Sequence, residues 1–170
     1  MSIKDLMSMA EPKPELNAQL FRKLKNCRPL NCFQCMRCSS GCTSLKLLEL
    51  KPHEVANLVK LGLIDELVAS GIAWTCATCL KCKERCPQKV TPYDIIMALR
   101  NQAVELEAKV PEAYLQAVSQ ILETGLMQPT QKISTKQLKV YSREELGLPP
   151  LQQLSDKFKQ AFLKTLEIQE

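Results

Sequence analysis

Residues 76–90, CATCLKCKERCPQKV, place four cysteines within eleven positions and follow the last of them with a proline. An earlier stretch, CFQCMRCSSGCT at 32–43, has the same spacing, CxxCxxCxxxC. Each cysteine of the second run lies 44 positions after its counterpart, which indicates that one unit is used twice. The cysteines in this register are Cys32, Cys35, Cys38, Cys42, Cys76, Cys79, Cys82 and Cys86.

The whole chain limits what these cysteines can do. Its 170 residues suit one compact domain with an appendage. The N-terminal stretch MSIKDLMSMAEPKPE has no basic region followed by an apolar block, so we expect no secretory signal, and we expect no membrane span because no long apolar run occurs. We therefore expect a cytoplasmic protein, in which thiols stay reduced and clustered cysteines bind metal or act in catalysis.

The spacing favours iron–sulfur clusters over zinc. Structural zinc sites use separated pairs of ligands, often with histidine, and the single histidine of this chain, His53, lies outside both runs. Three thiolates at two-residue gaps, a fourth three residues later and then proline form the pattern of bacterial ferredoxins with two clusters. The sequence thus predicts two [4Fe-4S] clusters. A cluster-based redox sensor and a zinc-stabilised binding module remain as alternatives.

In the two-cluster pattern the fourth cysteine of each run ligates the other cluster. The predicted ligands of the first cluster are Cys32, Cys35, Cys38 and Cys86. Those of the second cluster are Cys76, Cys79, Cys82 and Cys42. Thr43 follows the first run where Pro87 follows the second, so we expect the two runs to end in different turns. Cys27 lies outside the register, and we expect it to be a small buried residue near the end of the first helix.

The charge pattern agrees with buried negative clusters. The formal net charge of +5 counts every cysteine as neutral. An oxidised [4Fe-4S] core with four thiolates carries −2, so two clusters would leave a net charge of about +1. The basic residues near the runs would offset that negative charge. Low aromatic content and the absence of a basic stripe alternating with stacking residues argue against nucleic-acid binding.

Apolar spacing predicts helices over 14–26, 52–62, 64–71, 93–109 and 111–125 and no convincing strand. Thr91 is a predicted helix cap, and His53 a predicted surface or capping residue. Trp74 suits either a cluster shield or the core. A connector after residue 127 leads to an amphipathic helix that packs on the protein itself or on a partner. The apolar stripe of that last helix is Leu151, Leu154, Phe158, Phe162 and Leu166.

The spacer between the two runs is long enough for two helices that pack over the clusters. We therefore predict an all-α fold: an α-helical ferredoxin-like domain that binds two [4Fe-4S] clusters, with a C-terminal helical extension. The expected divisions are an N-terminal helix in 1–30, the ferredoxin domain in 31–126, and the connector with its amphipathic helix in 127–170.

At this level of detail the chain resembles one family. The stretch NCFQCMRCSSGC, the helical spacer and LVKLGLIDELVASGIAWTCATCLKCKERCPQKVTPYDIIMALRNQA are similar to the C subunit of heterodisulfide reductase, an oxidoreductase of methanogens and their relatives. The similarity extends from about residue 31 to residue 103.

The resemblance implies a role in electron transfer during methanogenesis. In this family the C subunit passes electrons from a flavin- and iron–sulfur-containing A subunit to the catalytic B subunit, which reduces the heterodisulfide of coenzyme M and coenzyme B. A hydrogenase or formate dehydrogenase module can belong to the same assembly. The register cysteines carry over as cluster ligands, and no catalytic residue is expected on this chain. Related modules in heterodisulfide-reductase-like and other iron–sulfur oxidoreductase complexes remain an alternative.

Overall fold

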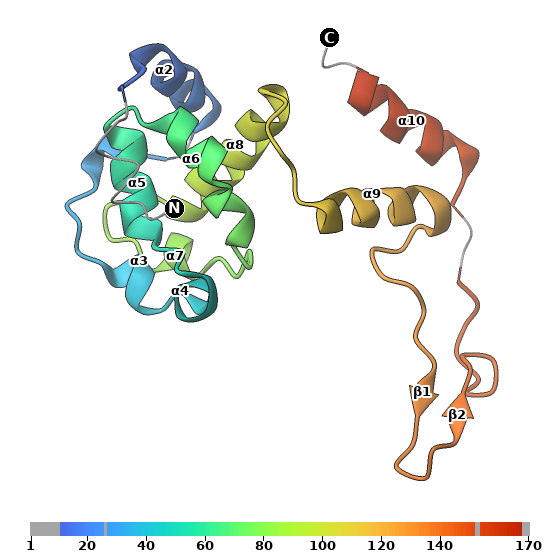
Figure 1. Cartoon of the computed structure of the whole chain (residues 1–170). Coiled ribbons are helices and arrows are strands. Elements are labelled where there is room, and N and C mark those ends of the chain that lie inside the picture. Colours follow the sequence, from blue (N-terminus) through green and yellow to red (C-terminus); the bar gives the residue numbers. More distant parts are fainter. Residues whose placement is uncertain (1–10, 26, 152–153, 168–170) are drawn as a thin grey trace. The chain divides into compact units, whose positions relative to one another are not determined.

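The computed structural model describes residues 11–25, 27–151 and 154–167 (Figure 1). Contacts along the chain group into two compact units, Met1–Val110 and Pro111–Glu170, which are described separately below. The domain boundaries expected after residues 30 and 126 stay predictions. Parts of the predicted N-terminal segment (1–10 and 26) and of the C-terminal extension (152–153 and 168–170) lie outside the described residues.

The first unit is built of helices only within its described residues. Prolines occupy the first helical position of α2, α5 and α8, where the missing N–H costs nothing. The longer helices are α2 (Pro14–Lys23), α5 (Pro52–Lys60), α6 (Ile64–Ser70) and α8 (Pro92–Glu105). The shorter elements are the 3₁₀ turns η1 (Pro29–Asn31) and η2 (Ile72–Thr75) and the helices α3 (Arg37–Ser40), α4 (Thr43–Leu48) and α7 (Lys81–Glu84).

Helix α8 is the centre of this unit, because α2, α5, α6 and α7 all pack against it. The apolar faces predicted for the longer helices meet in one core. Its fully buried side chains include Leu20, Leu50, Val55, Val59, Ile64, Leu67, Ile95, Ile96 and Leu99. Burial of these side chains stabilises the fold by about 1.5–3 kcal/mol each relative to exposure.

The ends of the long helices confirm most of the sequence predictions. Gly62 and Gly71 follow α5 and α6 with positive φ, the left-handed conformation that ends helices. Helix α8 ends at Glu105, four residues before its predicted end. The prediction for Thr91 was wrong: its backbone is itself left-handed, and its side chain makes no cap hydrogen bond. Pro92 and the core contacts of α8 fix this helix start instead.

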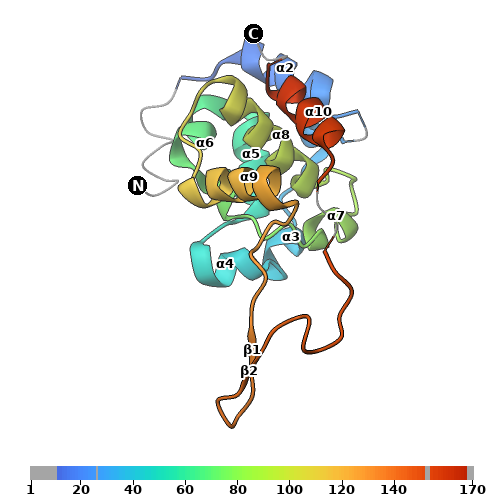
Figure 2. The same cartoon turned by 90° about the vertical axis from the view of Figure 1, so that its right-hand side faces the viewer.

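Helices α3, α4 and α7 gather at one end of the first unit, away from α2 (Figures 1 and 2). Helix α3 packs against α7 and against α5. These short helices were not predicted, because segments of four to six residues are too short to show a helical period. Their grouping brings the two cysteine runs together.

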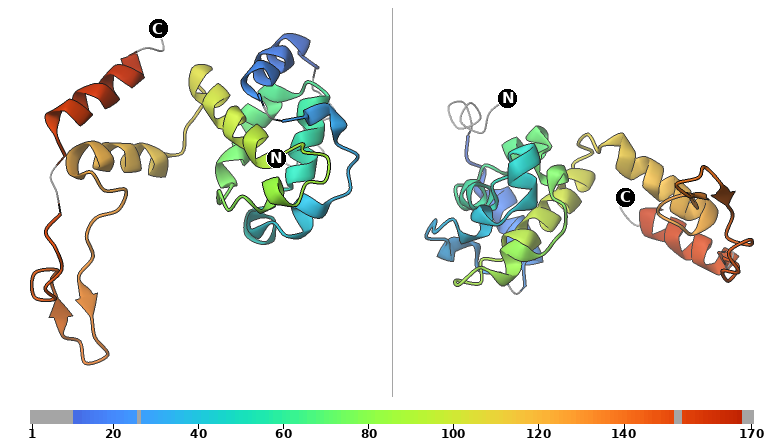
Figure 3. Two further views of the ribbon diagram at one scale, coloured as in Figure 1. Left: turned by 180° about the vertical axis from the view of Figure 1, so that it is seen from behind. Right: turned by 90° about the horizontal axis from the view of Figure 1, so that it is seen from below.

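The second unit contains α9 (Glu112–Thr124), β1 (Ile133–Ser134), β2 (Val140–Tyr141) and α10 (Asp156–Glu167). The strands pair antiparallel, with Ile133 opposite Tyr141 (Figure 3). The expectation of no strand was wrong here, because two exposed residues per strand are too few to form an alternating pattern.

The predicted stripe of the last helix is partly described. Leu154 packs over Gly125 at the end of α9, and the rings of Phe158 and Phe162 lie 6.1 Å apart. Leu151 is exposed, and the side chain of Leu166 lies outside the described residues. The chain as described is mostly helical, and none of the helices in the described ranges combines the length and apolar character needed to cross a membrane.

Candidate metal centre

The two cysteine runs share the same succession of backbone turns and short helices. A 3₁₀ turn precedes each run, η1 before Cys32 and η2 before Cys76. Positive φ angles recur at matched positions, 60° and 61° at Gln34 and Met36 and 51° and 62° at Thr78 and Leu80. Four-residue helices then follow, α3 in the first run and α7 in the second. Left-handed backbone is unfavourable at non-glycine residues. Its repetition at matched positions therefore indicates that both loops have the same structural role.

Burial of the cysteines repeats in the same way. Cys38 and Cys82 are each 8% exposed. Cys35 and Cys79 are exposed, and the first and last cysteine of each run are half-buried. Each run therefore presents its sulfur atoms over a range of depths, from the interior between α3 and α7 out to the surface.

Two hollows of similar size lie beside the runs, with volumes of about 340 and 320 Å³ including the solvent at their mouths. The cysteines that line the first hollow are Cys32, Cys35, Cys38 and Cys86. The cysteines that line the second are Cys42, Cys76, Cys79, Cys82 and, again, Cys38. Each hollow thus brings together three cysteines of one run with the last cysteine of the other.

The last cysteine of each run leaves its hollow by a different route. Thr43 begins helix α4 directly after Cys42, whereas Pro87 lies in a turn. The expected difference between the two exits is therefore present. The guanidinium group of Arg85 lies against Gly41, which has no Cβ to obstruct it. A positive charge from the second run consequently sits beside the end of the first run.

Two N–H groups point at sulfur atoms of the first hollow. The side-chain amide of Gln34 donates from Nε2 to Cys32 Sγ over 3.1 Å. The backbone N–H of Val90 donates to Cys86 Sγ over 3.2 Å. Such donors stabilise negative charge on sulfur, as thiolate ligands require.

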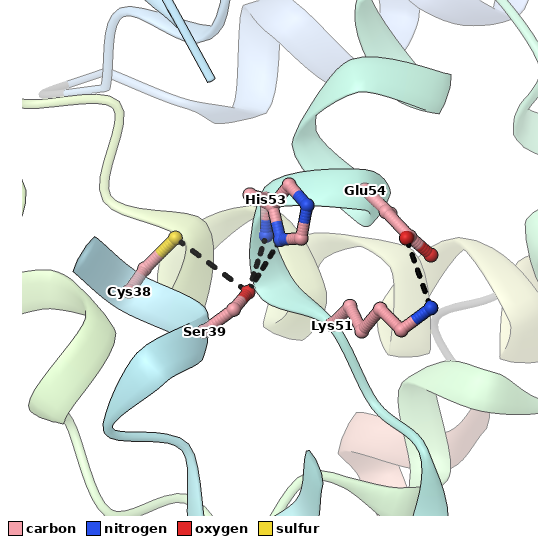
Figure 4. Close-up of polar contacts among 5 residues, drawn as sticks. All are labelled: Cys38, Ser39, Lys51, His53 and Glu54. Atoms are coloured by element: carbon pink, nitrogen blue, oxygen red, sulfur yellow. Dashed lines mark hydrogen bonds and ion pairs between the residues drawn. The ribbon is translucent and has the colours of Figure 1, made fainter. Parts of the chain in front are cut away.

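His53, which lines the first hollow, forms a buried pair with Ser39 (Figure 4). The backbone N–H of His53 donates to Ser39 Oγ over 3.2 Å, and Ser39 Oγ lies 2.6 Å from His53 Nδ1. Ser39 Oγ is also 4.0 Å from Cys38 Sγ. The expectation that His53 is a surface residue was wrong, because its side chain is 8% exposed. Burial lowers the pKa of the imidazole, which favours its neutral form.

Arg100 of α8 holds the chain segment that enters the second run. Its Nε donates to the carbonyl oxygen of Ala73 over 3.0 Å, and one terminal nitrogen donates to the carbonyl oxygens of Trp74 and Cys76 over 3.3 and 2.7 Å. The guanidinium carbon lies 5.4 Å from the centre of the Trp74 ring, a cation–π distance. Trp74 is half-buried and packs against the core.

Cys27 stands apart from both hollows. It is half-buried, packs against the core and donates from Sγ to the carbonyl oxygen of Val90 over 2.6 Å. Burial raises the pKa of its thiol, so the neutral form is favoured. Its position agrees with the expected packing role near the end of the first helix.

The thiols crowd one another strongly enough to affect their ionisation. Burial, and after it the neighbouring sulfur atoms of Cys76, Cys38, Cys42 and Cys79, together raise the pKa of Cys82 to about 12. Burial likewise raises the pKa of Cys38. A coordinating metal inverts this behaviour, because its positive charge removes the proton from a bound thiol. The gathered thiols therefore fit a cationic iron–sulfur core.

Among the described residues, no group of three or more cysteine, histidine or acidic side chains is arranged around a single metal ion. The four thiolates of a [4Fe-4S] cluster bind four different iron atoms, so they surround a volume rather than a point. The cysteines around each hollow are arranged in that way.

Three residues of this site were missed by sequence reasoning: Gln34, Ser39 and Arg100. Of these three, only Arg100 could have been noticed from the sequence, because it is the one charged residue within the apolar stretch IIMALRNQA. The roles of Gln34 and Ser39 depend on His53, which lies on a separate helix, and no local pattern reveals that contact.

Comparison with known proteins agrees with the cysteine geometry. Residues 31–91 match the family model described as a 4Fe-4S dicluster domain. The chain is 30% identical over 137 residues to the C subunit of the H(2):CoB-CoM heterodisulfide,ferredoxin reductase of Methanothermobacter thermautotrophicus, covering 81% of this chain and 71% of that protein.

Two further relatives carry related names. This chain is 35% identical over 129 residues to an iron–sulfur C subunit of the CoB–CoM heterodisulfide reductase of Methanocaldococcus jannaschii. The match covers 74% of this chain and 66% of that protein. The chain is 31% identical over 139 residues to the C subunit of the Ferredoxin/F(420)H(2)-dependent CoB-CoM heterodisulfide reductase of Methanosarcina acetivorans, covering 81% of this chain and 82% of that protein.

Proposed function

Because this chain belongs to the family of heterodisulfide reductase C subunits, we propose that it is the electron-transfer subunit of such a complex. It receives electrons from a flavin-containing A subunit and passes them to a catalytic B subunit. The B subunit uses them to reduce the heterodisulfide of coenzyme M and coenzyme B. The proposed domain that does this is an α-helical ferredoxin fold within residues 31–126, preceded by an N-terminal helix and followed by the 127–170 extension.

The observation that supports this role best is the crossed composition of the two hollows. We assign Cys32, Cys35, Cys38 and Cys86 to the first [4Fe-4S] cluster, because these four line one hollow. We assign Cys76, Cys79, Cys82 and Cys42 to the second. Cys38 also lines the second hollow, but it is counted with the first because the matching position of the repeat, Cys82, lines the second hollow alone.

When bound, each cluster supplies a one-electron couple, so two of them match the two electrons that a disulfide needs to become two thiols. The protein provides a short path between the two sites, since the buried Cys38 lines both hollows. The exposed Cys35 and Cys79 bring each site to the surface, where a partner can approach.

Basic side chains around the hollows offset the negative charge of the thiolates. Arg37 lines the first hollow and Lys81 the second. Arg85 lies beside Gly41 between the two runs. These exposed groups interact with the site through water, so each contributes modestly.

The chain supplies no nucleophile and base for disulfide chemistry in this proposal, because all register thiols are used as ligands. Substrate binding and bond cleavage then fall to the B subunit. The chain acts as the non-catalytic part of an oxidoreductase.

An electron-delivery experiment tests the proposal. The cluster-loaded chain is reduced, freed of excess reductant and mixed with heterodisulfide in the presence or absence of a heterodisulfide reductase B subunit. We expect its visible spectrum to return to the oxidised form only when the B subunit is present. Equal reoxidation without the B subunit, or none with it, would contradict the proposed role.

A further inference from the structure

Gln34 occupies a position from which its amide reaches two acceptors at once. Its Nε2 lies 3.1 Å from Cys32 Sγ and 3.2 Å from the backbone carbonyl oxygen of His53. A ligand thiolate and a carbonyl oxygen can only accept, so the NH₂ end of the amide must face them. The orientation of the side chain is therefore fixed by its partners.

The surroundings of Gln34 keep that amide in place. Its backbone has a φ of 60°, a left-handed conformation within the loop that Cys32 begins. The residue that accepts its second hydrogen bond, His53, is itself held by the buried Ser39 through both its backbone N–H and its ring. The donor is thus positioned before any charge develops on the sulfur, so no reorganisation is needed.

The repeat gives an internal comparison. The matching position in the second run is Thr78, which has the same left-handed backbone, with a φ of 51°, and no side-chain amide. The loop conformation therefore does not require glutamine. At this position of the repeat, only the first site has a side-chain amide.

A donor to a ligand sulfur acts on the redox equilibrium. Reduction adds one electron to a cluster and increases the negative charge on its sulfur atoms, so an N–H group stabilises the reduced form more than the oxidised form. No bond is formed or broken in this step, and the amide hydrogens stay on Gln34. Such a donor makes the reduction potential more positive.

We propose that Gln34 is a positioning residue that raises the reduction potential of the cluster held by Cys32, Cys35, Cys38 and Cys86, through its hydrogen bond to Cys32. This inference rests on the proposed function, because it assumes that the first hollow holds a [4Fe-4S] cluster. It adds a difference between two sites whose ligand loops share the same turns and left-handed residues. The first cluster is then easier to reduce than it would be in the same loop without a donor at position 34.

The test replaces Gln34 with methionine, which has a similar length but no N–H donor. Met36 shows that methionine tolerates the left-handed backbone of this loop. Redox titration of the full, cluster-loaded chain, followed by electron paramagnetic resonance, should show a more negative midpoint potential for the first cluster only. We expect the reduced-to-oxidised ratio at a fixed potential to fall about tenfold, equivalent to about 59 mV for one electron.

The matched control is Thr78→Met, which places the same side chain at the equivalent turn of the second run. It should leave both midpoint potentials unchanged. An unshifted first cluster in Gln34→Met, or an equal shift of the second cluster in Thr78→Met, would overturn the inference. Failure of the cluster assignment is distinguishable, since the wild-type chain would then lack cluster iron and sulfide altogether. Failure of the electron-transfer role is also distinguishable, since the cluster-loaded wild type would then not be reoxidised in the presence of the B subunit.

A second measurement leaves Gln34 in place. Gln88 also lines the first hollow, so Gln88→Met is prepared with ¹⁵N-labelled glutamine side chains, leaving Gln34 as the labelled amide there. Pulsed electron paramagnetic resonance of the reduced first cluster should detect weak coupling to a ¹⁵N nucleus. Absence of that coupling, with the cluster present, would rule out the hydrogen bond and hence the inference.

Discussion

The guanidinium group of Arg100 donates a 2.7 Å hydrogen bond to the backbone carbonyl oxygen of Cys76. Arg100 is 8% exposed and belongs to α8, the helix against which most of the first unit packs. The same group also binds the carbonyl oxygens of Ala73 and Trp74. The entrance to the second cysteine run is therefore attached directly to the core.

We expect Arg100→Leu to weaken the second site more than the first. The substitution leaves carbonyl oxygens buried without these donors, at a cost of about 3 kcal/mol. In a urea titration of the cluster-loaded protein, the visible cluster absorbance should disappear at lower denaturant than in the wild type. Arg100→Lys, which keeps the charge and one of the donors, should have a smaller effect. A wild-type titration curve for Arg100→Leu would show that these bonds do not support the site.

Anaerobically purified protein should be brown and contain about eight iron and eight inorganic sulfide per chain, as two cubane clusters require. Removal of iron by a chelator should bleach the colour and release the thiols. Metal analysis and sulfide determination on the same sample provide the measurement. Stoichiometric zinc without sulfide would support the zinc-binding alternative instead.

The crossed assignment of ligands predicts a specific pattern among cysteine-to-serine variants. Cys42→Ser should perturb the same cluster as Cys79→Ser, and Cys86→Ser the same cluster as Cys35→Ser, because serine substitutes a hard oxygen for a soft thiolate. Low-temperature electron paramagnetic resonance distinguishes the two signals.

The control for this series is Cys27→Ser, since Cys27 lies outside both hollows and should affect neither signal. If Cys42→Ser instead matched Cys35→Ser, each run would hold its own cluster. The two runs would then be joined by helix packing alone, and the crossed ferredoxin arrangement would have to be abandoned.

Two buried serines should affect different sites. Ser39→Ala removes the acceptor of the His53 N–H and should loosen the first site, at a cost of about 1–3 kcal/mol. Ser44→Ala removes the acceptor of the Ala77 N–H, which lies within the second run, and should loosen the second site by a similar amount. The rate at which each electron paramagnetic resonance signal is lost in urea measures this. Loss of the same signal first in both variants would refute the assignment of each serine to one site.

The cluster-loaded chain on its own should not reduce heterodisulfide, even with excess low-potential electron donor. All register thiols serve as ligands in the proposed function, and no separate nucleophile-and-base pair is assigned. Thiol production from heterodisulfide is the measurement, with the chain plus a B subunit as the positive control. Turnover by the chain alone would place a catalytic site on it.

The sequence alone determined the features that depend on short separations along the chain. Cysteine spacing and the offset of 44 residues marked two equal ligand loops, and the structure gives those loops the same turns and left-handed residues. Apolar periodicity and helix-starting prolines likewise located α2, α5, α6, α8 and α9, because helical contacts repeat every three to four residues.

Only the tertiary structure decided which distant residues meet. The grouping of Cys86 with the first run depends on how α5 and α6 fold back onto α8, and the hydrogen bonds of Arg100 depend on the same packing. The prediction for His53 was wrong for this reason. Its burial depends on segments far away in the sequence that pack against it, and the residues next to it in the sequence do not indicate which segments these are. Local spacing could specify the ligands, whereas the hydrogen bonds that His53 makes with Gln34 and Ser39 join segments far apart in the chain.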